Sequence, residues 1–337
     1  MNEYYEWLTN IGSLNFRKKS ALLIGAGNIA KHHLNALLRL NINDITVISN
    51  TSNQDSDFLK NSNIKFFSGG FEKNLPKLEE KDITIIATPI HLLVDVAKFA
   101  IKNGQNNILI EKPGSLYSNN LLFEKTEKNL QTVRIAYNRL TYPSLHKLKK
   151  LTQDDGGITS CRFTMTEWID KIDLTNNIDD VYQRWGISNS LHVISMVSNL
   201  IGLPKEIDAK QSGYLDWHKS GSIFVGSGIS EKSIPFSYHA DWKSNGRWGI
   251  EVFTEKNSYL LTPLEQLFVC PKNSTNWTPV KLEPAFPDIK AGIAEQIAIM
   301  LSDETKIKSE LIDLDRGIDL IQTAEKIFGY KSDKKLV

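Results

Sequence analysis

The sequence predicts an α/β protein: a doubly wound parallel sheet in its first part, then an α+β domain with mainly antiparallel strands. Its 337 residues exceed what one ordinary core holds, so two domains are expected. From Ser20 short β-rich runs alternate with helical patterns, and after Tyr137 alternating apolar and polar segments replace them. We therefore expect one domain over 1–138, including an N-terminal extension over 1–18, and a second over 139–337.

In the first domain each predicted strand is a short apolar run rich in β-branched residues, as in buried parallel sheets. Strands are expected at 21–25, 45–49, 83–87, 107–111 and 133–137, with a further short strand at 64–69. Helices are expected at 29–40, 91–103 and 120–130, and 51–63 is a polar connection.

In the second domain apolar and polar residues alternate, as in antiparallel strands with one face buried. Strands are expected at 158–165, 222–229, 233–242 and 248–255, and helices at 144–151, 188–201 and 316–328.

Composition limits the classes of function. Hydrophobic residues make up 41% and charged residues 23%, as in ordinary globular proteins. A net charge of +1 provides no general attraction for nucleic acid or anionic membranes, so small molecules or copies of the same chain are the expected partners. Cys161 and Cys270 are too few for a disulfide framework or a cysteine metal site, and the N-terminus has no apolar run typical of a signal peptide. We expect a cytoplasmic protein without a metal site.

The segment LLIGAGNIAKHH contains G-x-G-x-x-A between a predicted strand and a predicted helix. Gly25 permits a tight turn, Gly27 lets the backbone approach a pyrophosphate, and Ala30 lets helix and strand pack closely. The first helical residues, Asn28 and Ile29, present N–H groups to the phosphate. The pattern predicts a Rossmann dinucleotide site; a plain strand-to-helix turn is the alternative.

The choice between NAD and NADP depends on the end of the second strand, where an acidic residue would bind the ribose of NAD. The residues there are Ser49, Asn50, Thr51 and Ser52. Without a carboxylate to repel a 2′-phosphate the segment leans toward NADP, but it has no arginine to bind one. A solvated turn is the alternative.

The segment ILIEKPGS places Glu111, Lys112 and Pro113 directly after a hydrophobic strand. Ligands of open parallel sheets bind beyond the carboxyl ends of the strands, so Lys112 is expected near the nicotinamide. A partly desolvated lysine can donate to a substrate oxygen and relay a proton. A surface lysine without function is the alternative.

With GAGNIAKHH, Ala87-Thr88-Pro89, Glu111-Lys112-Pro113 and a helix bearing His192, the sequence resembles the glucose-fructose oxidoreductase, inositol dehydrogenase and rhizopine-catabolism (Gfo/Idh/MocA) family. The resemblance covers about residues 20–329. It implies a Rossmann domain followed by a domain with a large, mainly antiparallel sheet that binds substrate and often builds oligomers, here a homodimer or homotetramer. It also implies NAD(P)-dependent hydride transfer at a carbon of a sugar, cyclitol or nucleotide-linked sugar.

The resemblance assigns roles by position. Gly25, Gly27 and Ala30 match the pyrophosphate turn, and His33 matches a histidine frequent on the first helix. Ala87, Thr88 and Pro89 match a loop along the cofactor, and Glu111 and Lys112 match the nicotinamide-side pair. The family often has a histidine where Leu93 stands; His91 lies two residues earlier and is kept as a cofactor candidate. The family's aspartate four residues before the second-domain histidine is Ser188 here.

His192 is the second catalytic candidate, because histidine is the commonest general acid or base. On a regular helix Ser188 and Ser195 would share its face, and Asn189 could flank it. A buried structural histidine is the alternative. Without the aspartate, we expect Lys112 and His192 to manage the proton while Ser188 and Asn189 position substrate hydroxyls by neutral hydrogen bonds.

Further substrate contacts are expected at the domain junction and in the loop before His192. The candidates are Tyr137, Asn138, Arg139, Arg184 and Trp185. Arg139 could bind a phosphate or carboxylate, or could form an interdomain ion pair.

These features predict an NAD(P)-dependent dehydrogenase or ketoreductase acting on a carbohydrate, with a nucleotide-linked sugar in surface polysaccharide synthesis as one expected substrate. The alternative, suggested by Ser188, is a catalytically inactive dinucleotide- or ligand-binding regulator of the same fold.

Overall fold

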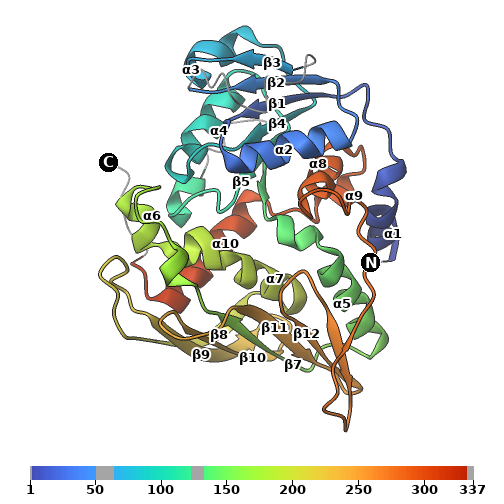
Figure 1. The fold of residues 1–337 in the computed structure, drawn as a ribbon, viewed down its shortest axis with the longest axis vertical. Helices are drawn as coiled ribbons and strands as arrows, with labels where there is room; N and C mark the ends of the chain where they lie inside the picture. Colours follow the sequence, from blue (N-terminus) through green and yellow to red (C-terminus); the bar gives the residue numbers. More distant parts are fainter. Residues whose placement is uncertain (1, 51–63, 123–132, 332–337) are drawn as a thin grey trace.

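The structure, a computed structural model, describes residues 2–50, 64–122 and 133–331 and contains two sheets, one above the other in Figure 1. The upper sheet is parallel and the lower one mostly antiparallel, which confirms the predicted fold class. Thr51 and Ser52, the connection 51–63 and most of the predicted helix 120–130 lie outside the described residues. No helix in the described ranges is long and apolar enough to cross a membrane.

The first sheet has six strands in the order β3-β2-β1-β4-β5-β6. All neighbouring strands run parallel, and this is the doubly wound order of dinucleotide-binding domains. The six predicted strands are confirmed, and their bounds are β1 Ser20–Ile24, β2 Asp44–Ile48, β3 Ile64–Phe67, β4 Ile83–Ile86, β5 Ile108–Glu111 and β6 Val133–Ala136. The order reverses between β1 and β4, where ligands of such sheets bind.

The helices of this domain begin where the strands end. They are α2 Asn28–Arg39, α3 Phe71–Asn74 and α4 Leu93–Lys102, with 3-10 turns η3 Leu75–Lys77, η4 Ile90–Leu92 and η5 Ser118–Leu121. The predicted helix 91–103 thus begins with a 3-10 turn.

A helix from far along the chain completes this domain. Helix α8 (Ile293–Leu301) packs against α2, and both contribute to one apolar cluster under the parallel sheet (Figure 1). All nine residues of α8 are buried, so the helix lacks the amphipathic pattern by which surface helices are predicted. The sequence prediction missed it for that reason.

The second sheet has eight strands in the order β14-β13-β12-β11-β7-β10-β9-β8, and its strands are antiparallel except for the pair β7 and β10. The bounds are β7 Ser160–Met165, β8 Pro204–Ser212, β9 Ile223–Ser230, β10 Pro235–Asp241, β11 Trp248–Phe253, β12 Asn257–Leu261, β13 Phe268–Pro271 and β14 Thr278–Pro279. The four predicted strands are confirmed. β8 was missed because it is a polar strand at the edge of the sheet.

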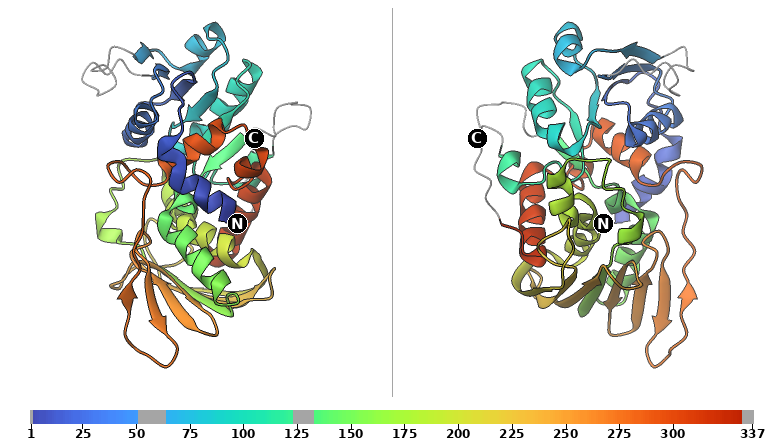
Figure 2. Two further views of the ribbon diagram at one scale, coloured as in Figure 1. Left: turned by 90° about the vertical axis from the view of Figure 1, so that its right-hand side faces the viewer. Right: turned by 60° about the vertical axis from the view of Figure 1, so that its left-hand side comes forward.

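Helices α7 (Leu191–Ile201) and α10 (Leu314–Phe328) lie between this sheet and the parallel one, and the other face of the sheet points outward (Figures 1 and 2). The remaining helical segments are α1 Asn2–Asn10, η1 Ile11–Ser13, η7 Asn138–Thr141, α5 Pro143–Asp154, η8 Ile169–Lys171, α6 Asp179–Gln183 and α9 Thr305–Lys308. The N-terminal extension is therefore helical, and Tyr4 on α1 contacts His146 on α5.

The predicted single helix 188–201 needs a correction. Residues Gly186–Ser190 form a π-helical turn, η9, and regular helix begins only at Leu191. A Cβ atom at Gly186 would lie 2.4 Å from the Phe328 ring, so the chain approaches α10 closely here. Such wide turns redirect side chains and are frequent at functional sites.

Candidate active site

The turn between β1 and α2 leaves room for a phosphate group. Gly25 has a φ of +120°, and a Cβ atom there would lie 2.3 Å from the Ala87 carbonyl oxygen, so this position requires glycine. A Cβ atom at Gly27, the N-cap residue of α2, would meet no protein atom within 4 Å. No side chain in the described ranges caps α2, which leaves its first N–H groups, at Asn28 and Ile29, open to an anion. The turn fits the pyrophosphate of a dinucleotide.

The loop after β4 borders this turn. Its Thr88 hydroxyl oxygen is buried without a hydrogen-bond partner among the described residues, as expected of a group that awaits a ligand. On the other side, Asn50 is exposed at the end of β2. Because Thr51 and Ser52 lie outside the described residues, the choice between NAD and NADP stays a prediction.

The Glu111 carboxylate is held by helix α2. His33 is fully buried, and its Nε2 atom lies 2.7 Å from Glu111 Oε1. The other oxygen, Oε2, accepts a hydrogen bond from the Lys112 backbone N–H at 3.2 Å. Glu111 thus links the end of β5 to α2 and forms no ion pair with the Lys112 ammonium group.

Lys112 reaches across to the second domain. Its Nζ atom donates a 2.6 Å hydrogen bond to the backbone carbonyl oxygen of Ser188 in the π-helical turn. Burial lowers the pKa of Lys112 to about 8; the carboxylates Glu111 and Glu167 act in the opposite direction. A lysine with this pKa can both donate and accept a proton near neutral pH.

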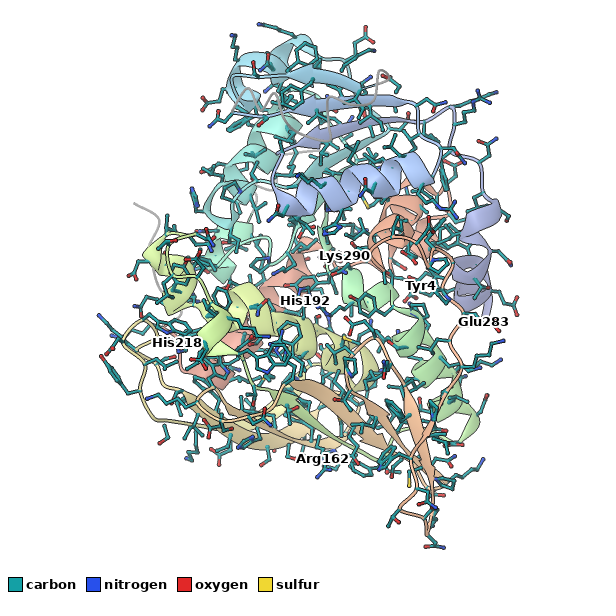
Figure 3. The ribbon with its side chains drawn as sticks, in the orientation of Figure 1. Tyr4, Arg162, His192, His218, Glu283 and Lys290 are labelled. Carbon is teal, nitrogen blue, oxygen red and sulfur yellow. The ribbon has the colours of Figure 1, made fainter. Side chains whose placement is uncertain are left out.

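His192, on α7, lies below Lys290 in Figure 3 and is only 5% exposed. Its Nδ1 atom has no hydrogen-bond partner among the described residues, and its ring lies 5.8 Å from the Trp248 ring. Burial, followed by the positive charges of Arg139, Lys112, Lys290 and Arg247, lowers the pKa of His192 well below 6.5. The imidazole is therefore neutral at physiological pH.

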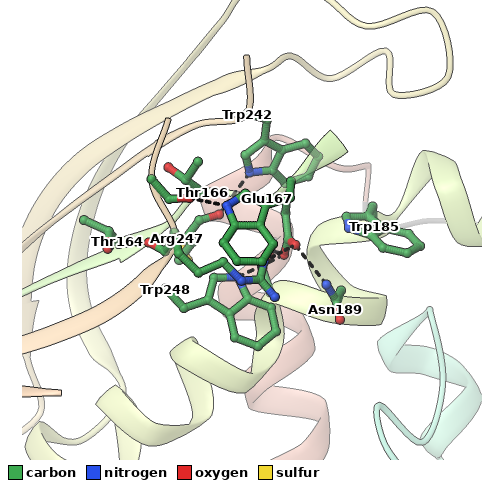
Figure 4. A network of polar contacts seen from close by, with 12 residues as sticks. Thr164, Thr166, Glu167, Trp185, Asn189, Trp242, Arg247 and Trp248 are labelled. Atoms are coloured by element: carbon green, nitrogen blue, oxygen red, sulfur yellow. Dashed lines mark hydrogen bonds and ion pairs between the residues drawn. The ribbon is translucent and has the colours of Figure 1, made fainter. Parts of the chain in front are cut away.

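Glu167, just after β7, is a buried carboxylate at the centre of a polar network (Figure 4). Oε2 accepts hydrogen bonds from Asn189 Nδ2 at 2.9 Å and from an Arg247 guanidinium nitrogen at 3.0 Å. Oε1 accepts from Ser190 Oγ at 2.5 Å and from Trp248 Nε1 at 3.1 Å. Burial raises the pKa of Glu167, and these donors counteract the rise.

Sequence reasoning did not single out Glu167 or Arg247. The one available signal was an acid just after one strand and a base just before another. That signal has meaning only once β7 and β11 are known to be antiparallel neighbours, with Trp248 opposite Met165.

Arg139 and Lys290 add two positive charges near His192 and Lys112. The Arg139 guanidinium lies 5.0 Å from the Trp248 ring centre and 5.8 Å from that of Tyr142. Its Nε atom is buried and has no hydrogen-bond partner in the described part of the chain. The predicted alternative of an interdomain ion pair for Arg139 finds no support there.

Arg184 is held by protein groups, and its predicted contact with substrate stays a prediction. It is buried, and its guanidinium donates to the carbonyl oxygens of Leu116 and Lys331 and to Glu325. It also lies over the rings of Tyr117 and Tyr330. A motif shows that an arginine is present but not that it is buried among acceptors.

Tyr137 and Asn138 are also more enclosed than expected. Tyr137 is fully buried, which speaks against direct contact with a substrate. Asn138 Nδ2 donates to the carbonyl oxygen of Ala291 and so links η7 to the segment before α8.

The candidates next to His192 are partly engaged by protein. Asn189 bonds Glu167, the Ser188 hydroxyl donates to the Trp185 carbonyl oxygen, and the Ser195 hydroxyl donates to the His192 carbonyl oxygen. Trp185 stacks on Tyr182, and its Nε1 atom is buried with no hydrogen-bond partner among the described residues. Ser188 thus contributes its backbone carbonyl to Lys112, not its hydroxyl; substrate contacts by Ser188, Asn189 and Trp185 stay predictions.

His91 lines a pocket of about 330 Å³ between α4, the loop after β5 and α6. Asp95, Lys98, Tyr117 and Asp180 also line this pocket. Contact of His91 with the cofactor stays a prediction. In the described ranges no cluster of three or more His, Cys, Asp or Glu side chains could hold a metal ion.

Comparison with known proteins agrees with the geometry of the first domain. Residues 19–139 match the GFO_IDH_MocA family model, described as an oxidoreductase family with an NAD-binding Rossmann fold. A search of curated protein sequences finds no match for this chain.

Several solved structures are similar over nearly the whole chain. An oxidoreductase from Thermotoga maritima has 17% identity and a TM-score of 0.72, covering 92% of this chain and 95% of its own. The UDP-N-acetylglucosamine 3-dehydrogenase GnnA from Acidithiobacillus ferrooxidans has 13% identity and a TM-score of 0.68, covering 93% and 98%. A levoglucosan dehydrogenase in complex with NADH and L-sorbose has 16% identity and a TM-score of 0.71, covering 93% and 96%. At these identities the likeness shows the shared fold.

Proposed function

Residues 19–139 match the Gfo/Idh/MocA family model, and we propose that the chain is an oxidoreductase of this family, an NAD(P)-dependent dehydrogenase or ketoreductase. Its substrate is a sugar, cyclitol or nucleotide-linked sugar. The observation that carries the proposal is the hydrogen bond from Lys112 Nζ to the Ser188 carbonyl oxygen. It places a lysine with a lowered pKa beyond the carboxyl end of β5, on the ligand side of the parallel sheet.

The residues of the first domain suit a dinucleotide. The backbone around Gly27 would hold the pyrophosphate, and the buried Thr88 hydroxyl, which has no hydrogen-bond partner within the described ranges, could bind the same ligand. When bound, NAD(P) supplies the hydride acceptor or donor.

Lys112 is the proton-handling group of the site. In oxidation of a CH–OH group, neutral Lys112 Nζ would accept the hydroxyl proton, while bound NAD(P)⁺ would supply the hydride-accepting chemistry. In the reverse direction the Lys112 ammonium group returns a proton to the carbonyl oxygen. With its pKa near 8, Lys112 has both forms available at physiological pH.

His192 has a different task from the one its residue type suggests. A pKa well below 6.5 makes it a weak base, so it acts as a neutral imidazole that hydrogen-bonds the reacting oxygen and orients the substrate. The sequence-based hypothesis that Lys112 and His192 manage the proton together is thereby narrowed to Lys112 as the proton carrier and His192 as its positioning partner.

The sugar class rests on the fold and on its neighbours. Solved structures of this fold include a UDP-N-acetylglucosamine 3-dehydrogenase and a levoglucosan dehydrogenase bound to L-sorbose. Aromatic rings near the cleft, Trp185 and Trp248, offer apolar surfaces that suit a sugar ring. We propose a cytoplasmic homodimer or homotetramer, which light scattering on purified protein tests.

The test combines binding and turnover. NADH and NADPH are titrated into the protein by fluorescence, and a panel of sugars, cyclitols and nucleotide sugars is assayed in both directions at 340 nm. The proposal expects micromolar binding of one dinucleotide and turnover of at least one compound, lost in Lys112→Met. Dinucleotide binding without turnover across the panel would favour the regulatory alternative, which Ser188 motivates.

A further inference from the structure

We infer that the substrate carries a negatively charged oxyacid group, a carboxylate or a phosphate, and that Arg139 and Lys290 bind it. The inference rests on the proposed function, since it concerns the same cleft. It follows from an excess of positive charge around His192 that the carboxylates of the described part of the chain offset only in part: Glu167 pairs with Arg247, whereas Arg139 and Lys290 have no such partner there.

Four cations surround the imidazole of His192. Arg139, Lys112, Lys290 and Arg247 all lie close enough for their charges to lower its pKa. Like charges gathered in a partly buried cleft repel each other and are costly unless anions compensate them.

The carboxylates of the cleft are already engaged. Glu111 binds His33 through one oxygen and the Lys112 backbone N–H through the other. Glu167 accepts four hydrogen bonds, one of them from Arg247. Neither carboxylate forms an ion pair with Arg139 or Lys290 among the described residues.

The π-helical turn before His192 contributes no carboxylate at the position of Ser188. Ser188 stands where the resembling family carries an aspartate, and its carbonyl oxygen is bound to Lys112 Nζ. A carboxylate at that position would have compensated one of the four cations. In this chain a bound substrate is left to supply the negative charge.

The surroundings of Arg139 suit the binding of a carboxylate or phosphate. Its guanidinium lies 5.0 Å from the centre of the Trp248 ring and 5.8 Å from that of Tyr142, within the range of a cation–π contact. Its Nε atom is buried and unpartnered. A planar guanidinium whose Nε–H group has no acceptor within the described part of the protein can bind an oxygen of a carboxylate or phosphate.

Lys290 is the second cation of the proposed anion-binding site. It lies in the segment leading to α8. Burial lowers the pKa of Lys290, the negative charge of Glu111 raises it, and the positive charge of Arg139 lowers it further. Figure 3 shows Lys290 and His192 at the level between the two sheets. An anion between Lys290 and Arg139 would relieve their mutual repulsion.

The cofactor's own phosphates have other places. The pyrophosphate is expected at the Gly27 turn, and a 2′-phosphate of NADP would lie at the end of β2. Arg139 and Lys290 act instead on Lys112 and His192, the groups at the reacting carbon. The anionic group therefore belongs to the substrate and lies near the carbon that is oxidised or reduced.

The test uses three sugars that differ in charge: D-glucose, D-glucuronate and D-glucose 6-phosphate. Each is titrated calorimetrically into protein saturated with NADH or NADPH, whichever binds. We expect one or both anionic sugars to bind at least about tenfold more tightly than glucose, as charge-assisted hydrogen bonds allow. The comparison of glucuronate with glucose 6-phosphate decides between carboxylate and phosphate.

Variants locate the effect. Arg139→Gln and Lys290→Gln should each remove most of the preference for the anionic sugar and leave the affinity for the dinucleotide unchanged. Lys205→Gln, which removes an exposed charge on β8 away from the cleft, is the matched control.

Different results would contradict the anionic substrate and the proposed dehydrogenase function. Equal affinity for the three sugars, or no binding of any, overturns the anionic substrate, as does an anion preference that survives both cleft variants. Failure of both NADH and NADPH to bind at millimolar concentration would overturn the proposed function itself.

Discussion

Lys112 Nζ donates a 2.6 Å hydrogen bond to the carbonyl oxygen of Ser188, so a lysine at the end of β5 is joined to the π-helical turn before His192. This bond joins the end of a strand of the parallel sheet to a helical turn in the second half of the chain. It orients the lysine by a neutral backbone acceptor, which holds the side chain without stabilising its charge as a carboxylate would.

Lys112→Met should abolish most turnover. Loss of the proton-handling group lowers kcat by roughly 10²- to 10⁴-fold, the usual contribution of general acid–base catalysis. Dinucleotide affinity should change little, because the pyrophosphate turn is untouched. Steady-state kinetics with fluorescence titration measures both, and the exposed Lys102→Met on α4 is the control. A Lys112→Met enzyme with near-normal kcat would contradict the assignment.

The pH dependence should follow Lys112. Its pKa is lowered to about 8, so the neutral amine that accepts a proton increases as pH rises through 8. In the oxidative direction kcat should therefore rise with pH to a plateau above about 9, and in the reductive direction it should fall over the same range. Because the pKa of His192 lies well below 6.5, no step near pH 6.5 is expected from it. A profile governed by a group titrating near 6.5 would be evidence against a neutral His192.

Glu167→Gln should destabilise the protein even though its shape is conserved. Each Glu167 oxygen accepts two donors, so the amide nitrogen of glutamine would face either Asn189 and Arg247 or Ser190 and Trp248. In the first orientation Asn189 and Arg247 lose their acceptor, and in the second the buried Trp248 Nε1–H group loses its acceptor while the Ser190 hydroxyl can turn to accept; either loss costs about 1–3 kcal/mol. Urea denaturation measures the loss, with the exposed Glu255→Gln as control. If both variants unfold alike, the network contributes nothing to stability.

Features encoded by a short stretch of the sequence could be predicted, whereas features built from distant segments of the chain could not. Gly25, Gly27 and Lys112 each lie directly after a strand, so a strand pattern and a short motif suffice to place them. The Glu167 network and Lys290 could not be placed, since strand pairing and the return of the chain before α8 bring them to the cleft. The ion pair of Arg184 with Glu325 could not be predicted either, because the two residues are 141 positions apart in the chain.

His33→Ala should weaken the link between α2 and β5. His33 is fully buried against Glu111, and its removal leaves a buried carboxylate oxygen without its partner, which costs about 1–3 kcal/mol. His32→Ala, one position away and half-buried, should cost less. Thermal unfolding compares the two, and a larger effect at His32 would show that the Glu111 contact is not the stabilising one.

Gly27→Ala and Gly25→Ala should separate cofactor binding from folding. A Cβ atom at Gly27 meets no protein atom within 4 Å, so Gly27→Ala should fold with an unchanged melting temperature. The same methyl group would occupy the space of the pyrophosphate, and dinucleotide affinity should fall by about tenfold or more, equivalent to about 1.4 kcal/mol.

Gly25→Ala should behave in the opposite way. Its φ of +120° and the 2.3 Å approach of a Cβ atom to the Ala87 carbonyl oxygen force the junction of β1 and β4 apart. We expect a lower melting temperature together with lost binding. Because the two substitutions add the same methyl group two residues apart, their contrast isolates the ligand: a Gly27→Ala protein that binds NADH and NADPH normally would show that the phosphate does not lie at this turn.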